Sequence, residues 1–231
     1  KYREASRNGK ESDELIDLLG QDLDELKKAR ASQDTKLENT ILPVEEFNVL
    51  DLPPKRRIMS PWLSEQSINL ISGFRGTGKT WFALSILDSV TSQQKFGPWE
   101  TITPVPCLIL DGEMAAQDIQ DRMKSLNHHE RKSPLHIYSD AYSSSQGNPR
   151  ANLANEAWRT HMMDILIKRN IKLWVIDNIA SLASGLDENS KQDWDPVNQW
   201  LLSLRFAGIS TILLHHVNKE GGQRGTSARE D

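Results

Sequence analysis

Ile68-Asn-Leu-Ile-Ser-Gly73-Phe-Arg-Gly76-Thr-Gly78-Lys79-Thr80 is the stretch of sequence that decides the fold. Its last eight residues match the phosphate-binding motif G-x-x-x-x-G-K-[ST]. Residues 68–72 before the motif predict a strand, and residues 79–90 predict a helix. Glycines let the backbone N–H groups turn toward a β-phosphate, and the positive end of the following helix points at the same place. The stretch therefore predicts a nucleoside triphosphate site.

The side chains of this loop have expected partners in ATP and Mg²⁺. Lys79 can bridge the β- and γ-phosphates, and the Thr80 hydroxyl can ligate Mg²⁺. For Trp81 and Phe82, which follow on the helix, packing against the sheet is favoured over stacking on adenine. The residues predicted to bind the nucleotide are Gly73, Phe74, Arg75, Gly76, Thr77, Gly78, Lys79, Thr80, Trp81 and His215.

Short apolar runs alternate with helical patterns from residue 67 onward. This alternation predicts an α/β fold with a mostly parallel, twisted, doubly wound sheet flanked by helices, and a ligand at the carboxyl ends of the strands. Strands are expected at 68–72, 107–111, 135–138, 173–177 and 209–214. Helices are expected at 79–90, 115–126, 153–169 and 193–206.

Two strand ends supply carboxylates. Leu173-Trp-Val-Ile-Asp177 has the form of a Walker B strand, so Asp177 is expected to support the metal together with Thr80. The next residue is Asn178 and not Glu, so the catalytic base must come from elsewhere. Glu113, after the apolar residues 108–110, is the candidate, on a strand expected to lie next to the strand of the phosphate loop. Asp111 is the competing candidate for the role of base, but it is placed earlier on the strand.

The last expected strand leads into His215-His216-Val217-Asn218-Lys219. A neutral His216 at a strand end could sense the γ-phosphate, whereas paired histidines can also serve packing alone. Zinc is disfavoured because the chain has no H-x-x-x-H spacing and no cysteine partner here. Arg224, in the following loop 221–226, is a candidate arginine finger supplied to a neighbouring subunit or a contact to nucleic-acid phosphate.

The acidic character of the chain belongs to its first part. The 231 residues carry 28 basic and 32 acidic side chains, for a net charge of -4. Residues 1–52 contain 8 basic and 13 acidic side chains, and the remainder contains 20 and 19. Residues 11–29 predict one or two amphipathic helices interrupted near Gly20, and residues 32–40 predict a linker. We therefore expect an acidic helical linker, or the end of a preceding domain, over 1–52, and an ATPase domain over 53–231.

Composition excludes several classes of protein. Ordinary glycine, proline and charged fractions exclude collagen-like and wholly disordered chains. No apolar run reaches the roughly 18 residues of a membrane span. The lone Cys107 cannot form an internal disulfide, so a cytoplasmic protein without membrane partners is expected. The first residue is not Met, which indicates a processed chain or part of a longer one.

From about Pro53 to its end, the chain resembles the RecA-like core of the hexameric replicative helicases of the RepA and DnaB types. Four segments carry the resemblance in the family's order: 73–80, 113–122, Asp177 and 215–219. In the second, a Glu-Met pair is followed by a helix with Arg122. In the fourth, RepA-type proteins also have paired histidines, and DnaB-type proteins have Gln at the place of His216. Arg224-Gly-Thr-Ser is similar to Arg-Gly-Ser-Ser of RepA-like proteins.

The resemblance implies a Mg²⁺-dependent ATPase that drives translocation or unwinding of DNA. It implies a ring, most often a hexamer, with single-stranded DNA as partner. The implied catalytic residues are Lys79, Glu113, His216 and Arg224. The family's core normally continues further, so the domain 53–231 is expected to be incomplete at its C-terminus. Residues 9–26 loosely resemble the end of the primase half of phage-type primase-helicases, and this resemblance implies a linked primase domain in a longer parent chain. A linker helix that docks on the next subunit of a ring explains the same pattern.

Other functions stay open at this point. One is a RecA-like recombination or repair ATPase, which remodels DNA without unwinding it. Another is a regulatory switch ATPase that signals to a protein partner. A phosphotransferase is less favoured, because no segment resembles an acceptor lid.

Overall fold

The computed structural model describes residues 12–126, 129–187 and 190–217. The chain divides into two compact units, Lys1–Pro54 and Lys55–Asp231, which are described separately. Within the described residues, no helix has the length and apolar character needed to cross a membrane.

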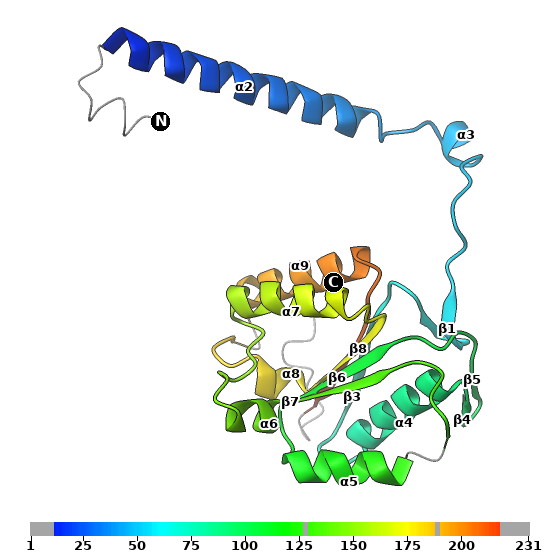
Figure 1. The fold of residues 1–231 in the computed structure, drawn as a ribbon. Coiled ribbons are helices and arrows are strands. Elements are labelled where there is room, and N and C mark those ends of the chain that lie inside the picture. Colours follow the sequence, from blue (N-terminus) through cyan, green and yellow to red (C-terminus); the bar gives the residue numbers. More distant parts are fainter. Residues whose placement is uncertain (1–11, 127–128, 188–189, 218–231) are drawn as a thin grey trace. The chain divides into compact units, whose positions relative to one another are not determined.

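The first unit contains one long helix, α2 (Ser12–Glu38), and a short one, α3 (Val44–Phe47) (Figure 1). Helix α2 runs through Gly20 and covers most of the stretch predicted as a linker, so the predicted interruption and the predicted linker at 32–38 are wrong. A single glycine costs a helix only about 1 kcal/mol relative to alanine, and the surrounding leucine, lysine, glutamate and alanine residues favour helix. Within the helix, the Thr35 hydroxyl donates to the Ala31 carbonyl one turn earlier at 2.9 Å.

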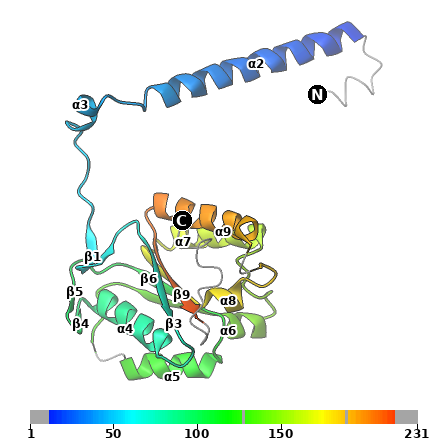
Figure 2. The ribbon, with the colours of Figure 1, turned by 180° about the vertical axis from the view of Figure 1, so that it is seen from behind.

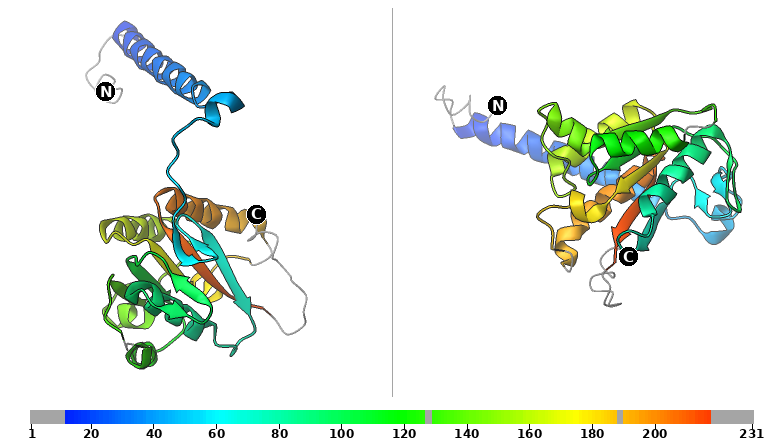
Figure 3. Two further views of the ribbon diagram at one scale, coloured as in Figure 1. Left: turned by 90° about the vertical axis from the view of Figure 1, so that its right-hand side faces the viewer. Right: turned by 90° about the horizontal axis from the view of Figure 1, so that it is seen from below.

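The second unit is built on a five-stranded sheet whose neighbours are all parallel. The order β3-β9-β8-β6-β7 joins β3 (Ile68–Gly73), β9 (Ser210–His216), β8 (Leu173–Asp177), β6 (Cys107–Asp111) and β7 (Leu135–Ser139). Figure 3 shows β9 running beside β3. The predicted class, a parallel sheet flanked by helices, is confirmed, and the five predicted strands are present.

The expectation that β6 lies next to the phosphate-loop strand β3 is wrong. Strands β9 and β8 lie between β6 and the phosphate-loop strand β3. Both β6 and β8 are buried along their whole length, whereas residues of β3 alternate between exposed and half-buried. Apolar content predicts a buried strand, but it does not say which other strand lies next to it.

Helices cover both faces of this sheet (Figures 1 and 2). Helices α4 (Lys79–Ser92) and α5 (Ala116–Leu126) pack on one face, and α7 (Glu156–Lys168) and α9 (Lys191–Phe206) pack on the other. The four predicted helices are confirmed, with ends set by capping. Asn155 accepts the Trp158 N–H at 3.0 Å and begins α7, and Ser190 accepts the Asp193 N–H and begins α9. Short helices α6 (Asp140–Ser145) and α8 (Ile179–Leu182) follow β7 and β8 directly.

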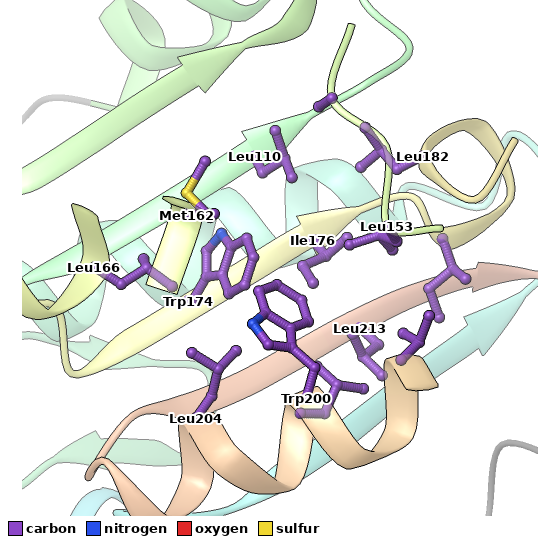
Figure 4. Packing of buried hydrophobic residues seen from close by; sticks show 14 of the residues in the cluster. Leu110, Leu153, Met162, Leu166, Trp174, Ile176, Leu182, Trp200, Leu204 and Leu213 are labelled. Atoms are coloured by element: carbon purple, nitrogen blue, oxygen red, sulfur yellow. The ribbon is translucent and has the colours of Figure 1, made fainter. Parts of the chain in front are cut away.

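Tryptophans fill the core under α7 and α9. Trp174 of β8 meets Trp200 of α9 edge to face, with ring centroids 5.3 Å apart, and Trp158 meets Trp200 at 6.3 Å. Figure 4 shows the two buried rings side by side among the leucine side chains of the cluster.

A small antiparallel sheet, which the sequence did not predict, extends the domain. It has the order β2-β1-β5-β4, from β1 (Arg57–Ser60), β2 (Leu63–Ser64), β4 (Lys95–Phe96) and β5 (Trp99–Thr101). Strands of two to four residues are too short to show an alternating pattern. The side chains of Trp62, Phe82, Phe96 and Trp99 pack edge to face here, so the packing role predicted for Phe82 is confirmed.

Candidate active site

The phosphate loop joins β3 to α4 through two glycines in left-handed conformation. Gly76 has a φ of 81° and Gly78 a φ of 86°, which other residues adopt only with strain. Helix α4 begins at Lys79, immediately after Gly78. The free N–H groups of the first helical turn therefore lie at the end of the loop, where they can bind an anion.

Lys79 is folded over its own loop. Its Nζ donates hydrogen bonds to the carbonyl oxygens of Gly73 at 2.7 Å and Phe74 at 2.8 Å. Burial lowers the pKa of Lys79, although the nearby Asp177 and Glu113 carboxylates oppose that change. The ammonium group is thus held at the loop by two carbonyls that phosphate oxygens could replace.

Thr80 and Asp177 meet between α4 and the carboxyl end of β8. The Thr80 hydroxyl donates to Asp177 Oδ2 at 2.6 Å. Burial raises the pKa of Asp177, and this hydrogen bond partly offsets the effect. A hydroxyl and a carboxylate at this spacing are oxygen ligands of the kind Mg²⁺ prefers. No cluster of three or more His, Cys, Asp or Glu ligands occurs in the described part of the chain, so a Mg²⁺ ion here would take its other ligands from phosphate and water.

Glu113 reaches the phosphate loop although two strands, β8 and β9, lie between β6 and the phosphate-loop strand β3. Its Oε1 is 3.5 Å from Arg75 Nη2 of the loop, and its Oε2 is 3.4 Å from His216 Nε2 at the end of β9. Glu113 extends beyond β6 and across the strand ends, so it does not need the adjacency that the sequence suggested. The Glu113 side chain is 32% exposed, which leaves it accessible to water.

The paired histidines take different positions because successive residues of a strand point to opposite faces. His216 lies opposite Gly73 in the register of β3 and β9, and it contacts Glu113. Its other ring nitrogen, Nδ1, is buried and has no hydrogen-bond partner among the described residues. His215 lies opposite Ser72 and is only 9% exposed.

Trp81 does not pack against the sheet, so the packing prediction is wrong for this residue. Its ring is 41% exposed, and the Arg122 guanidinium lies 5.3 Å from the ring centroid. The helical turn places Lys79 and Ala83 toward the interior, which leaves Trp81 on the outer side of α4. The contact with Arg122 of α5 is a cation–π interaction.

Arg224 lies outside the described residues, as do Asn218, Lys219 and loop 221–226. The site described above therefore consists of residues from β3, α4, β8, β9 and the segment after β6.

Sequence reasoning missed two contributions to this site. Gly112 donates its N–H to the Asp177 carbonyl at 2.7 Å, which joins the segment after β6 to the end of β8. Arg150 Nε donates to the buried Asp140 Oδ2 at 2.8 Å, and Nη2 contacts the Gly112 carbonyl at 3.4 Å. Neither residue belongs to a recognised motif, and the contacts join segments far apart in the chain.

We expect replacement of Gly112 by alanine to destabilise the domain by about 1 to 3 kcal/mol, the usual cost of overpacking. A Cβ at this position would lie 2.7 Å from Leu182 Cγ and Cδ2 and 2.9 Å from Ser181 Oγ. Urea unfolding measures the change. The cost should shrink in a Leu182→Ala background, because that change removes the two closest obstructing atoms, Leu182 Cγ and Cδ2. An equal cost in both backgrounds would contradict the steric explanation.

Stability should also depend on pH through Asp111. Burial raises the pKa of this carboxyl from 3.8 to about 7. Between these values the native state keeps a proton that the unfolded chain releases, so the free energy of unfolding falls as pH rises through this window and stays level above it. Asp111→Asn removes this contribution. Urea unfolding from about pH 5 to 8 should therefore show the variant gaining stability relative to the parent chain as pH rises. If the free energies of unfolding of the two proteins change with pH in parallel, Asp111 does not make this contribution.

Comparison with known proteins agrees with this architecture. A family model described as an AAA domain matches residues 32–222. Among solved structures, a KaiC-like protein from the hyperthermophilic archaeon Pyrococcus horikoshii OT3 is similar with a TM-score of 0.53 and 24% sequence identity. The similarity covers 74% of this chain and 76% of that one, and it identifies the fold as RecA-like. No match was found among curated proteins.

Proposed function

Since the chain belongs to this family of AAA domains and has the fold of a RecA-like P-loop ATPase, we propose that it hydrolyses ATP to drive translocation along DNA or its unwinding, as the motor of a replicative helicase. One observation carries the hydrolytic part. Glu113, which is accessible to water, lies between Arg75 of the phosphate loop and His216 at the end of β9. A carboxylate in this place can accept a proton from a water molecule beside the γ-phosphate.

The described side chains divide the work of hydrolysis. Lys79 exchanges its contacts with the Gly73 and Phe74 carbonyls for β- and γ-phosphate oxygens. Thr80 and Asp177 hold Mg²⁺, which when bound neutralises phosphate charge. Glu113 takes a proton as the water oxygen bonds to the γ-phosphorus and the bond to the β–γ bridging oxygen breaks. His216, in contact with Glu113, responds to the presence of the γ-phosphate.

The rest of the nucleotide site follows the loop. Residues 73–80 surround the phosphates with backbone N–H groups. Trp81, exposed beside Arg122, offers a flat apolar surface at the edge of the site for the nucleotide base. His215 supports the site from within β9. Arg224 acts across the interface of a ring of subunits, most simply a hexamer.

The proposal that the motor acts on DNA is supported by four motifs in the order of the hexameric helicases. The charge of residues 53–231, with 20 basic and 19 acidic side chains, does not oppose it. Channel loops contact DNA with few basic groups, so a small local excess of positive charge suffices. A primase domain linked to the front of a longer parent chain fits the same proposal.

The test measures ATP hydrolysis by the full chain with and without single-stranded DNA, and strand displacement on a forked duplex. A helicase motor should show hydrolysis stimulated by DNA and unwinding that requires ATP. Stimulation without unwinding would favour a recombination or repair ATPase. Hydrolysis that DNA does not change would favour a switch ATPase acting on a protein. Native mass measurement with and without ATP tests the ring, which should appear as multiples of the 26.2 kDa chain.

A further inference from the structure

Asp111 is the last residue of β6, and it is completely buried. In the sheet it lies between Asp177 of β8 and Ser139 of β7. Burial of a carboxylate is unfavourable unless hydrogen bonds satisfy its oxygens. One oxygen of Asp111, Oδ2, has no partner among the described residues. An apolar residue would avoid this cost, so the reason for a carboxyl group must lie in its other oxygen.

The other oxygen, Oδ1, accepts the backbone N–H of Met114 at 2.9 Å. This bond closes a turn over residues 111–114, and Glu113 is within that turn. Gly112, on the other side of Glu113, donates its N–H to the Asp177 carbonyl at 2.7 Å. The backbone of Glu113 is therefore fixed on both sides, while its side chain reaches Arg75 and His216.

We propose that Asp111 is a positioning residue, which holds the turn 111–114 through the Met114 N–H so that Glu113 faces the phosphate loop. This inference rests on the proposed ATPase function, and it excludes Asp111 as a second base. The geometry favours positioning because Asp111 has no exposed surface through which water could reach it, whereas the Glu113 side chain is 32% exposed. An acceptor oxygen is needed for this role, and a negative charge is not.

Two variants separate positioning from base catalysis. Asp111→Asn keeps a side-chain oxygen that can accept the Met114 N–H, whereas Asp111→Ala removes it. We expect Asp111→Asn to keep kcat within about threefold, and Asp111→Ala to lower kcat about 10- to 100-fold, the range in which small misplacements of catalytic groups reduce rates. The dissociation constant for a non-hydrolysable ATP analogue should change little in either variant. The pH profile of kcat should be the same for Asp111→Asn as for the parent chain.

Asp88→Ala is the matched control. Asp88 is a buried carboxylate of α4 that accepts from Arg131 Nη1 at 2.7 Å and lies outside the site. Its replacement should lower thermal stability without a selective loss of kcat at a temperature where the domain is folded. The proposal is overturned if Asp111→Asn loses as much turnover as Glu113→Gln, or if Asp111→Ala retains the parent kcat.

A second measurement does not depend on activity. Hydrogen exchange of the Met114 amide, followed by NMR, should become about tenfold faster in Asp111→Ala and stay near the parent rate in Asp111→Asn, because the bond is lost only in the first. Unchanged exchange in both variants would overturn the positioning role. If the parent chain itself fails to hydrolyse ATP, the proposed function fails, and the exchange rates still decide whether Asp111 holds the turn.

Discussion

Replacement of Glu113 by glutamine should abolish ATP turnover while ATP binding remains nearly intact. Glutamine has the size and hydrogen-bonding reach of glutamate, but it cannot accept a proton from water. General-base catalysis contributes about 10²- to 10⁴-fold to enzymatic rates, so we expect kcat to fall by at least about 100-fold. Binding of ATP should persist because Lys79, Thr80 and the loop backbone are unchanged.

The measurement combines steady-state phosphate release with equilibrium binding of ATP. Glu100→Gln is the control, because Glu100 is an exposed residue of β5 in the small sheet. This control should keep the parent kcat. Normal hydrolysis by Glu113→Gln would remove Glu113 from the role of base.

Replacement of Lys79 by alanine should impair both nucleotide binding and hydrolysis. Hydrogen bonds to charged groups contribute about 1.5 to 3 kcal/mol each, so loss of the ammonium should weaken ATP binding about 10- to 100-fold. Turnover should fall further, because charge on the γ-phosphate grows in the transition state. Arginine should not restore the activity, because its planar head differs in shape from an ammonium group.

Titration of the variant with a non-hydrolysable ATP analogue, and phosphate release at saturating ATP, give the two quantities. Lys95→Ala, at an exposed position of β4, is the control for loss of a positive charge. Far-ultraviolet circular dichroism checks the fold, because Lys79 also bonds to the Gly73 and Phe74 carbonyls. An unchanged affinity for the analogue would contradict the assignment of Lys79 to the phosphates.

The sequence was informative wherever structure depends on neighbours in the chain. The strands Cys107–Asp111 and Leu173–Asp177 have the predicted bounds, because a continuous apolar run closed by a carboxylate indicates a short buried strand. Capping shifted the helix ends by a few residues, as at Asn155. The interruption predicted at Gly20 was wrong because glycine only weakens a helix, and α2 continues through it.

Several features of the site could not be predicted because they depend on contacts between distant segments. Glu113 lies beside the phosphate loop, but the strand order on which its selection as the base was argued is wrong. Asp111 and Glu113 are two residues apart and have the same chemistry, so the sequence favoured Glu113 as the base only by its later position on the strand. Burial separates them, since Asp111 is enclosed between β7 and β8 and Glu113 extends past the strand end.

The sequence by itself determined the phosphate loop, the strand and helix that flank it, and the position of Asp177 at the end of its strand. Glycine conformations and apolar periodicity, on which these features depend, act over a few residues. The tertiary structure alone decided that Glu113 lies between Arg75 and His216, and that Gly112 has no room for a side chain. Glu113 and His216 are 103 positions apart in the chain, so their distance is set by the order and register of the parallel strands. That order arises from how the two helical layers bury the sheet, which is a property of the whole domain and not of any local pattern.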